Sequence, residues 1–230
     1  IKYGAIASPM FPAFGPDAIK DRLLDSQAFA LVTDPELKKR VYEVKNQLPD
    51  LKHLIIVGDK PVDKGELSYN EEMKAASDKF DAVPMDPEES QFMLYTSGTT
   101  GKPKGVVHAH KGIVQQTIST RWVLDVHEED IYWCTADLGW VTGVVYGVLG
   151  PWANGTTQVG LGGRFDPERW YKTIQDHKVT VWYTAPTAVR MLMAKGDDLP
   201  KKYDLRSLRA LYCVGEPLNP EAVLWADEVL

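Results

Sequence analysis

The chain has little cysteine and no long uninterrupted run of apolar residues. Its two cysteines, Cys134 and Cys213, both lie in apolar, strand-like segments, which argues against a disulfide framework and indicates small buried side chains. The most apolar stretch, residues 140–152, is broken by glycines and is too short to span a bilayer. These absences favour a globular protein of a reducing compartment. We therefore expect a cytoplasmic location and no membrane partner.

An excess of positive charge is also missing. The 26 lysines and arginines are outnumbered by 32 aspartates and glutamates, which gives a net charge of −6. A nucleic-acid partner would require a basic face, so this balance argues against one. A local group of lysines can still hold an anionic ligand. With 44% apolar residues in 230, the chain has enough apolar material for a sizeable core in one large domain or two small ones.

The two ends of the sequence differ from those of a complete protein. Residues 1–11 open inside an apolar segment without an initiator methionine, and residues 221–230 stop within a helical pattern without a capping residue. We expect the chain to be a piece of a longer protein, incomplete at both ends.

Strand-like and helix-like segments alternate along the chain, which predicts an α/β fold with parallel sheets flanked by helices. In the first part we expect helices at 17–27, 35–48 and from about 68 onward, with buried strands at 28–33 and 51–58. An acidic segment with two prolines, 81–90, is the expected linker between a first lobe (1–90) and a second lobe (91–230). In the second lobe the expected strands are 91–96, 130–136, 157–163, 179–186 and 208–217, and the expected helices 111–122, around 146–149, 165–177 and 187–194.

Residues 96–105 combine four hydroxyl side chains, three glycines, one proline and two lysines directly after the strand 91–96. Ligands gather where the strands of such sheets end, and glycines there allow successive backbone N–H groups to turn toward one anion. This pattern predicts a phosphate-binding loop. An ordinary solvated loop is the alternative, and a P-loop is excluded because only two residues separate Gly98 from Gly101. The candidate phosphate-binding residues are Thr96, Ser97, Gly98, Thr99, Thr100, Gly101, Lys102 and Lys104.

The stretch "YTSGTTGKPKG" (95–105) resembles the signature phosphate loop of the adenylate-forming superfamily, which includes acyl-CoA synthetases, luciferases and peptide-synthetase adenylation domains. Three further stretches resemble acetyl-CoA synthetases in particular: "DIYWCTADLGWVTG" (130–143), "YTAPTAVRMLM" (183–193) and "CVGEPLNPEA" (213–222). The resemblance covers nearly the whole chain. It implies an internal fragment of the large N-terminal domain of such an enzyme, with two α/β lobes.

The resemblance assigns an acyl pocket to Trp140, Val141, Thr142 and Val214. The chemistry of these side chains is consistent with such a pocket, since a bulky indole beside a β-branched pair leaves a small apolar cavity. A buried core turn is the alternative, because large apolar residues usually belong to a core.

By the same resemblance, coenzyme A lies near Thr142 and Ala185, and adenine near Gly215, Glu216 and Pro217. Taken alone, these two stretches are ordinary turns, the first with Thr187 as a helix cap. The family's arginine-rich coenzyme A segment has no counterpart at 33–40. A family asparagine contact near 163–166 is replaced here by "GRFD", in which Arg164 is a candidate partner for a coenzyme A phosphate.

His108 and His110 are two positions apart just after the loop, so an extended backbone would place them on one face. No third metal ligand is evident in the sequence, and we expect these histidines to pack beneath the loop instead of binding a metal.

The resemblance implies a two-step reaction. Acetate attacks the α-phosphorus of ATP to give acetyl-AMP and pyrophosphate, and the thiolate of coenzyme A then displaces AMP, with Mg²⁺ as cofactor. The family's catalytic lysine, its mobile C-terminal domain and an aromatic segment that closes the acetate pocket have no counterpart in this sequence. The catalytic residues are therefore unknown, and we expect the 230 residues of this chain to be inactive by themselves. A propionyl- or medium-chain acyl-CoA synthetase, a non-catalytic nucleotide-binding protein and a scaffold domain remain alternatives, and the oligomeric state is open.

Overall fold

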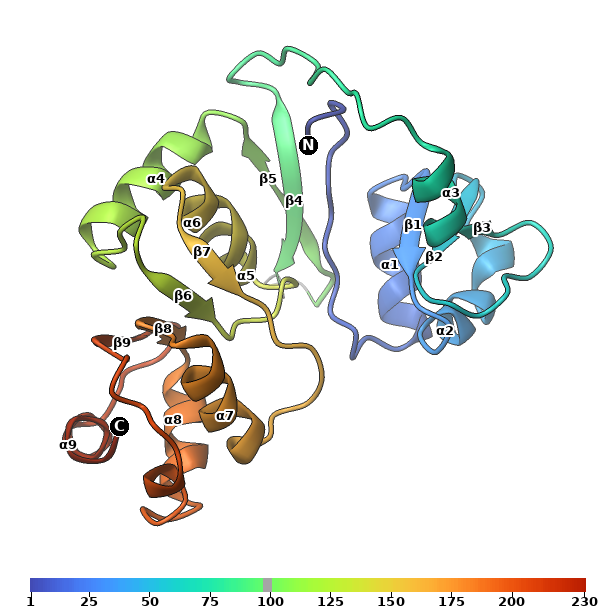
Figure 1. The fold of residues 1–230 in the computed structure, drawn as a ribbon. Helices are drawn as coiled ribbons and strands as arrows, with labels where there is room; N and C mark the ends of the chain where they lie inside the picture. Colours follow the sequence, from blue (N-terminus) through green and yellow to red (C-terminus); the bar gives the residue numbers. More distant parts are fainter. Residues whose placement is uncertain (97–100) are drawn as a thin grey trace. The chain divides into compact units, whose positions relative to one another are not determined.

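The computed structural model describes residues 1–96 and 101–230 (Figure 1). Its internal contacts divide the chain into two compact units, residues 1–110 and 111–230. The sequence analysis places a boundary near residue 90. Residues 76–89 form neither helix nor strand, which agrees with the irregular structure expected at 81–90. The division nevertheless falls after residue 110, because the strand that follows the linker bridges to Ala7 through Phe92 and so belongs to the first unit.

A parallel three-stranded sheet organises the first part of this unit, in the order β1-β2-β3. Its strands are β1 (Ala30–Thr33), β2 (His53–Ile56) and β3 (Leu67–Ser68). The parallel pairing of β1 with β2 confirms the parallel sheet expected from the strands at 28–33 and 51–58. The strand β1 is nonetheless less buried than expected, since Val32 is 56% exposed on this edge of the sheet. The short strand β3 is absent from the sequence prediction.

The helices of the first unit are α1 (Pro16–Asp25), α2 (Lys38–Tyr42), the 3₁₀ helix η1 (Lys45–Gln47) and α3 (Tyr69–Ala75). The single helix expected at 35–48 is wrong. Residues 35–37 form a turn in which Asp34 accepts hydrogen bonds from the backbone N–H groups of Glu36 and Leu37, and α2 begins only at Lys38. It ends before Val44, whose φ of −124° lies outside the helical region. The core of this unit consists of Ile19, Leu23, Val41, Val44, Leu48, Leu54 and Ile56.

An antiparallel hairpin completes the first unit. It pairs β4 (Ser90–Thr96) with β5 (Lys104–Ala109), so that Thr96 stands opposite Lys104. The sequence analysis predicts β4 but not β5, and it expects only parallel strands. Of the candidate phosphate-binding residues, Thr96 is thus the last residue of β4 and Lys104 the first residue of β5.

The second unit contains a parallel four-stranded sheet in the order β7-β6-β8-β9. The order of its elements confirms the expected α/β alternation (Figure 1). The strands are β6 (Ile131–Cys134), β7 (Thr157–Val159), β8 (Val181–Thr184) and β9 (Ala210–Cys213). The helices are α4 (Gly112–Trp122), α5 (Val141–Val144), the π-helix η2 (Val145–Leu149), α6 (Gly150–Ala153), α7 (Pro167–His177), α8 (Pro186–Met193), the 3₁₀ helix η3 (Pro200–Lys202) and α9 (Pro220–Val229).

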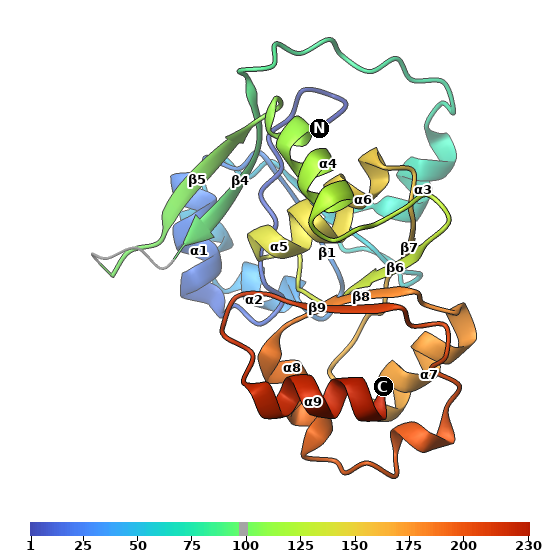
Figure 2. The same cartoon turned by 90° about the vertical axis from the view of Figure 1, so that its left-hand side faces the viewer.

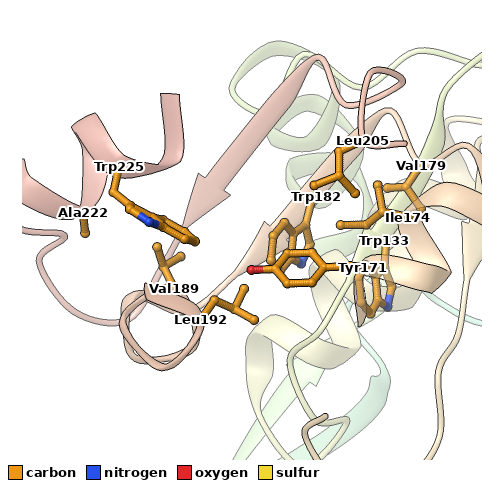
Figure 3. Close-up of a cluster of buried hydrophobic side chains, with 10 residues drawn as sticks. All are labelled: Trp133, Tyr171, Ile174, Val179, Trp182, Val189, Leu192, Leu205, Ala222 and Trp225. Carbon is orange, nitrogen blue, oxygen red and sulfur yellow. The ribbon is translucent and has the colours of Figure 1, made fainter. Parts of the chain in front are cut away.

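The helices cover both faces of this sheet, as Figure 2 shows, with α7, α8 and α9 on one side. Because side chains alternate along a strand, neighbouring residues supply two separate cores. On the side of α7, α8 and α9, Trp133 stacks on Trp182 with ring centroids 5.6 Å apart (Figure 3). On the other side, Tyr132 and Tyr183 pack with the loop that follows α4 and with η2. Both faces are therefore buried, as a parallel sheet requires.

Within residues 1–96 and 101–230, no helix combines the length and apolar character needed to cross a bilayer. Cys134 and Cys213 are both free thiols, and they are partly rather than fully buried. Burial raises the pKa of Cys134 to about 11, so its thiol is protonated at neutral pH.

Candidate active site

A cavity of about 440 Å³ lies in the second unit, where β6, β8 and β9 end. In parallel sheets, this carboxyl edge is where ligands bind. Its wall is mostly apolar, with a few hydroxyl and carboxylate groups, which is typical of a small-molecule site. The lining residues are Thr135, Ala136, Asp137, Trp140, Thr142, Trp170, Thr184, Ala185, Ala188, Val214, Gly215 and Glu216.

A tight turn after β6 brings Trp140 and Thr142 to the cavity. The carboxylate of Asp137 accepts a hydrogen bond from the N–H of Gly139 at 2.7 Å, and its carbonyl accepts one from the N–H of Trp140 at 3.0 Å. This turn packs directly on the backbone of Gly143, where an added Cβ would lie 2.1 Å from the carbonyl oxygen of Asp137. Only glycine allows this approach, so the spacing of the "DLGWVTG" segment follows from the packing of the turn on α5.

The end of β8 supplies small and polar groups. Thr184 is only 2% exposed, and its hydroxyl oxygen accepts a hydrogen bond from the Thr135 hydroxyl at 2.6 Å. The next residue, Ala185, is the N-cap of α8 and has no side chain that could cap the helix. Thr187 is thus not the cap, contrary to the sequence-based alternative. Ala185 and Ala188 leave open the space that a larger side chain would fill.

The end of β9 turns away from the sheet at Gly215, whose φ of +96° favours glycine. Glu216, the next residue, accepts a hydrogen bond from the backbone N–H of Thr187 at 3.0 Å, and its carboxylate also accepts from the Thr187 hydroxyl and from the Arg190 guanidinium. These bonds from Thr187 and Arg190 lower the pKa of Glu216, so the side chain is a carboxylate at neutral pH.

The cavity gathers six of the residues proposed from the sequence, and they come from three of the four motifs: Trp140, Thr142, Ala185, Val214, Gly215 and Glu216. Three others lie outside its lining. Val141 is the first residue of α5 and is 47% exposed, Pro217 is exposed after Glu216, and Arg164 is exposed between β7 and α7. The roles assigned to all nine stay predictions.

The candidate phosphate loop belongs to the first unit. Thr96 and Lys104 pair at the end of the hairpin, Lys102 is exposed, and Gly101 has a φ of +82°. Ser97, Gly98, Thr99 and Thr100 lie outside the described residues. The phosphate-binding role of the loop therefore stays a prediction.

Several cavity residues are missing from the sequence analysis. Thr135 and Thr184 are hydroxyls at strand ends, a position that signals a site in a parallel sheet. Trp170 comes from α7, where its ring packs edge-on against Trp133 at 5.3 Å and Phe165 at 4.6 Å. Its sequence pattern is that of a core residue, and nothing in it indicates a cavity.

In the described part of the chain, no group of three or more histidine, cysteine, aspartate or glutamate side chains is placed to hold a metal ion. His108 instead stacks on Phe92, with ring centroids 4.3 Å apart, and burial lowers its pKa. The described residues do not form a cage for Mg²⁺.

Comparison with known proteins places the whole chain in a family. The model of the AMP-binding enzymes matches residues 1–230. The chain belongs to the AMP-binding enzyme family. Among curated relatives, the chain is 52% identical over its full length to the acetyl-coenzyme A synthetase of Bacillus subtilis, and 44% identical over 97% of its length to that of Methanothrix thermoacetophila. It spans 40% and 37% of the length of these two relatives.

Two solved structures resemble this member of the family over nearly all of its residues. An acyl-CoA synthetase of Brucella canis matches 99% of the chain with a TM-score of 0.89 and 32% identity, and the match covers 41% of that protein. An anthranilate CoA ligase in complex with anthranoyl-AMP matches 100% of the chain with a TM-score of 0.93 and 28% identity, covering 44% of that protein. These neighbours confirm the predicted fold class and the assignment to adenylate-forming ligases.

Proposed function

We propose that the protein to which this chain belongs is an AMP-forming acetate–CoA ligase. In the first step, a carboxylate oxygen of acetate attacks the α-phosphorus of ATP, forming acetyl-AMP and releasing pyrophosphate. In the second step, the thiolate of coenzyme A attacks the acetyl carbonyl carbon and AMP leaves. The observation that carries this proposal is the single cavity shared by three motifs, in a chain 52% identical to an acetyl-coenzyme A synthetase.

In this proposal, the cavity residues bind and orient the substrates. Trp140 and Val214 supply apolar walls that limit the length of the acid. Thr142 and Ala185 are small, which leaves room for the thiol of coenzyme A beside the acyl carbon. Gly215 has no side chain, so the adenine ring can approach the backbone closely. Holding the reacting groups together in this way supplies much of the acceleration expected of such an enzyme.

The loop 96–105 is assigned to the triphosphate, with Lys102 and Lys104 providing positive charge where negative charge accumulates on the phosphates. Mg²⁺ commonly reaches such sites bound to substrate phosphates. In this proposal, Mg²⁺ enters the site bound to the phosphates of ATP.

The test is the exchange of labelled pyrophosphate into ATP by the full-length protein, with acetate, propionate, butyrate or no acid. We expect exchange that depends on an acid and is fastest with acetate, followed by formation of acetyl-CoA when coenzyme A is added. Faster exchange with propionate or butyrate would show that the longer acid, and not acetate, is the preferred substrate. Heat of ATP binding without exchange would favour a non-catalytic nucleotide-binding protein, and the lack of both would favour a scaffold.

The other expectations from the sequence stay proposals as well. They are a cytoplasmic location, the lack of a nucleic-acid or membrane partner, and the two-lobed domain that extends beyond this chain.

A further inference from the structure

The helix α8 begins at the cavity without a cap of its own. Its N-cap, Ala185, has no hydrogen-bonding side chain, and the first helical residue, Pro186, has no N–H group. The first backbone donor of the helix is therefore the N–H of Thr187, which would have no intrahelical partner. A carboxylate is the most favourable acceptor at this end, because the helix dipole is positive there.

Glu216 provides this acceptor from a different strand. One carboxylate oxygen accepts the N–H of Thr187 at 3.0 Å and also its hydroxyl, and the other oxygen accepts from Arg190, one turn further along α8. Arg190 also donates to the Thr187 hydroxyl at 3.1 Å. Both oxygens of Glu216 are thus engaged within the protein. We name the side chains of Glu216, Thr187 and Arg190 the Glu216 clamp.

The Glu216 clamp joins two segments that line the same cavity. Ala185 and Ala188 stand at the start of α8, and Gly215 immediately precedes Glu216. A glycine with a positive φ leaves its turn free to adopt many conformations unless another contact fixes it. Among the described residues, the backbone hydrogen bonds between β9 and β8 extend as far as Val214, whose N–H donates to the carbonyl of Thr184 at 3.1 Å. Beyond that point, the Glu216 clamp connects the turn to α8.

We propose that Glu216, Thr187 and Arg190 are positioning residues that set the separation of the adenine segment from the coenzyme A segment, without contact between the Glu216 carboxylate and either substrate. This inference rests on the proposed function and goes beyond it, because it assigns the Glu216 side chain to the protein framework and adds Thr187 and Arg190 to the site. Loosening the clamp is expected to weaken the binding of both ATP and coenzyme A, while the chemistry at the acyl group changes little.

The test is a double-mutant cycle in the full-length protein. Glu216→Gln keeps an oxygen for the Thr187 N–H but removes the ion pair, and Arg190→Met keeps the apolar stem but removes the guanidinium. Each is expected to raise the Kd for ATP and the KM for coenzyme A by about three- to tenfold, with kcat within about twofold. The double variant is expected to be no weaker than either single variant, and Arg190→Lys should recover part of the loss.

The matched control is Arg206→Met, which breaks another exposed arginine–carboxylate pair of the second unit, with Asp204. This variant should leave the Kd for ATP and the KM for coenzyme A unchanged. The inference is overturned if the two single effects add, if Glu216→Gln weakens only ATP binding while Arg190→Met has no effect, or if the variants lower only the melting temperature. The first result would show that Glu216 and Arg190 act independently, the second would place the Glu216 carboxylate on the nucleotide, and the third would make the clamp purely structural.

The Kd for ATP keeps this test separate from that of the proposed function. A wild-type protein that binds ATP but catalyses no acetate-dependent exchange would refute the proposed function, and the clamp would still be judged by the Kd values of its variants. A wild-type protein that does not bind ATP would overturn both.

Discussion

Val214 follows β9 and lines the cavity together with Trp140 and Trp170. In the proposed function, its two methyl groups occupy the space that one more carbon of a longer acid would take. A hydrophobic pocket discriminates by about 10- to 200-fold per methylene group, so one such side chain can decide between acetate and propionate.

We therefore expect Val214→Ala to raise the ratio of kcat/KM for propionate to that for acetate by about tenfold. The measurement is steady-state kinetics of the full-length protein with both acids. The control is Val223→Ala on α9, where the side chain is 49% exposed and outside the cavity. An unchanged ratio would show that Val214 does not contact the acid.

At this scale, the sequence predicts those cavity residues that belong to contiguous motifs. Trp140, Ala185 and Gly215 are found in this way because each stands in a short segment that follows a strand. Trp170 cannot be found, because it enters the cavity only through the packing of α7 on the sheet. The partners of Glu216 are missed for a similar reason: Thr187 is 29 positions away and meets it only where two parallel strands end.

Among the elements, the helical segment α5–η2–α6 approaches its neighbours most closely at glycines. A Cβ on Gly150 would lie 2.2 Å from the Thr120 hydroxyl on α4, and one on Gly143 would lie 2.1 Å from the Asp137 carbonyl. The second contact supports the turn that carries Trp140. The start of α5 and the wall of the cavity therefore depend on each other.

Gly143→Ala is accordingly expected to destabilise the protein by about 1–3 kcal/mol and to raise the KM for acetate, because the Asp137 turn must move. Thermal unfolding and steady-state kinetics of the full-length protein measure the two effects. Gly160→Ala is the control, since a Cβ there meets nothing within 4 Å. Wild-type stability and KM in Gly143→Ala would contradict the close packing of this turn.

The sequence predicts most strands and helices of the second unit, where hydrophobic runs and proline or glycine boundaries are clear. It fails at β5, because Val106 and Val107 are both exposed and so give no alternation between buried and exposed positions. It also joins α2 and η1 into one helix, because the apolar spacing of Val41, Val44 and Leu48 continues through the break.

For the whole molecule, a charged network at the amino edge of the second sheet bears on stability. Asp130 precedes β6 and is 4% exposed, and it accepts hydrogen bonds from Arg209 at 2.9 Å, from Thr180 at 2.7 Å and from the backbone N–H of His127 at 2.8 Å. Burial alone would raise the pKa of Asp130, but these bonds together lower it to about 2. The network ties the starts of three strands together, at the opposite edge from the cavity.

Because the pKa of Asp130 is lower in the folded state than in the unfolded state, its contribution is fully present above about pH 4 and is lost as the pH falls toward 2. The lost contribution is about 2 kcal/mol. Asp130→Asn should be less stable than wild type at pH 6, and the gap should narrow toward pH 3. Melting temperatures of the full-length protein across this range measure it, and a gap that stays constant with pH would contradict the assignment.

The boundary between the two units could not be predicted from the sequence. The acidic segment 81–90 does lack helix and strand, yet the division falls after residue 110. The composition of 81–90 indicates a segment without helix or strand, whereas the attachment of β4 to the first unit depends on long-range contacts such as the hydrogen bond from the Tyr95 hydroxyl to Asp25 at 2.7 Å. The sequence does not contain these contacts in any local pattern.

The central claim is that the cavity at the ends of β6, β8 and β9 binds the acyl-adenylate. The most direct measurement is calorimetric binding of a non-reactive acetyl-adenylate analogue to full-length wild type, Ala185→Trp and the control Leu224→Trp, which places the same indole on the exposed face of α9. Because Ala185 is exposed and lines the cavity, its replacement should fill the cavity without unfolding the protein. We predict that the wild type and Leu224→Trp bind the analogue alike and that Ala185→Trp binds it at least about tenfold more weakly; equal affinity in all three would contradict the claim.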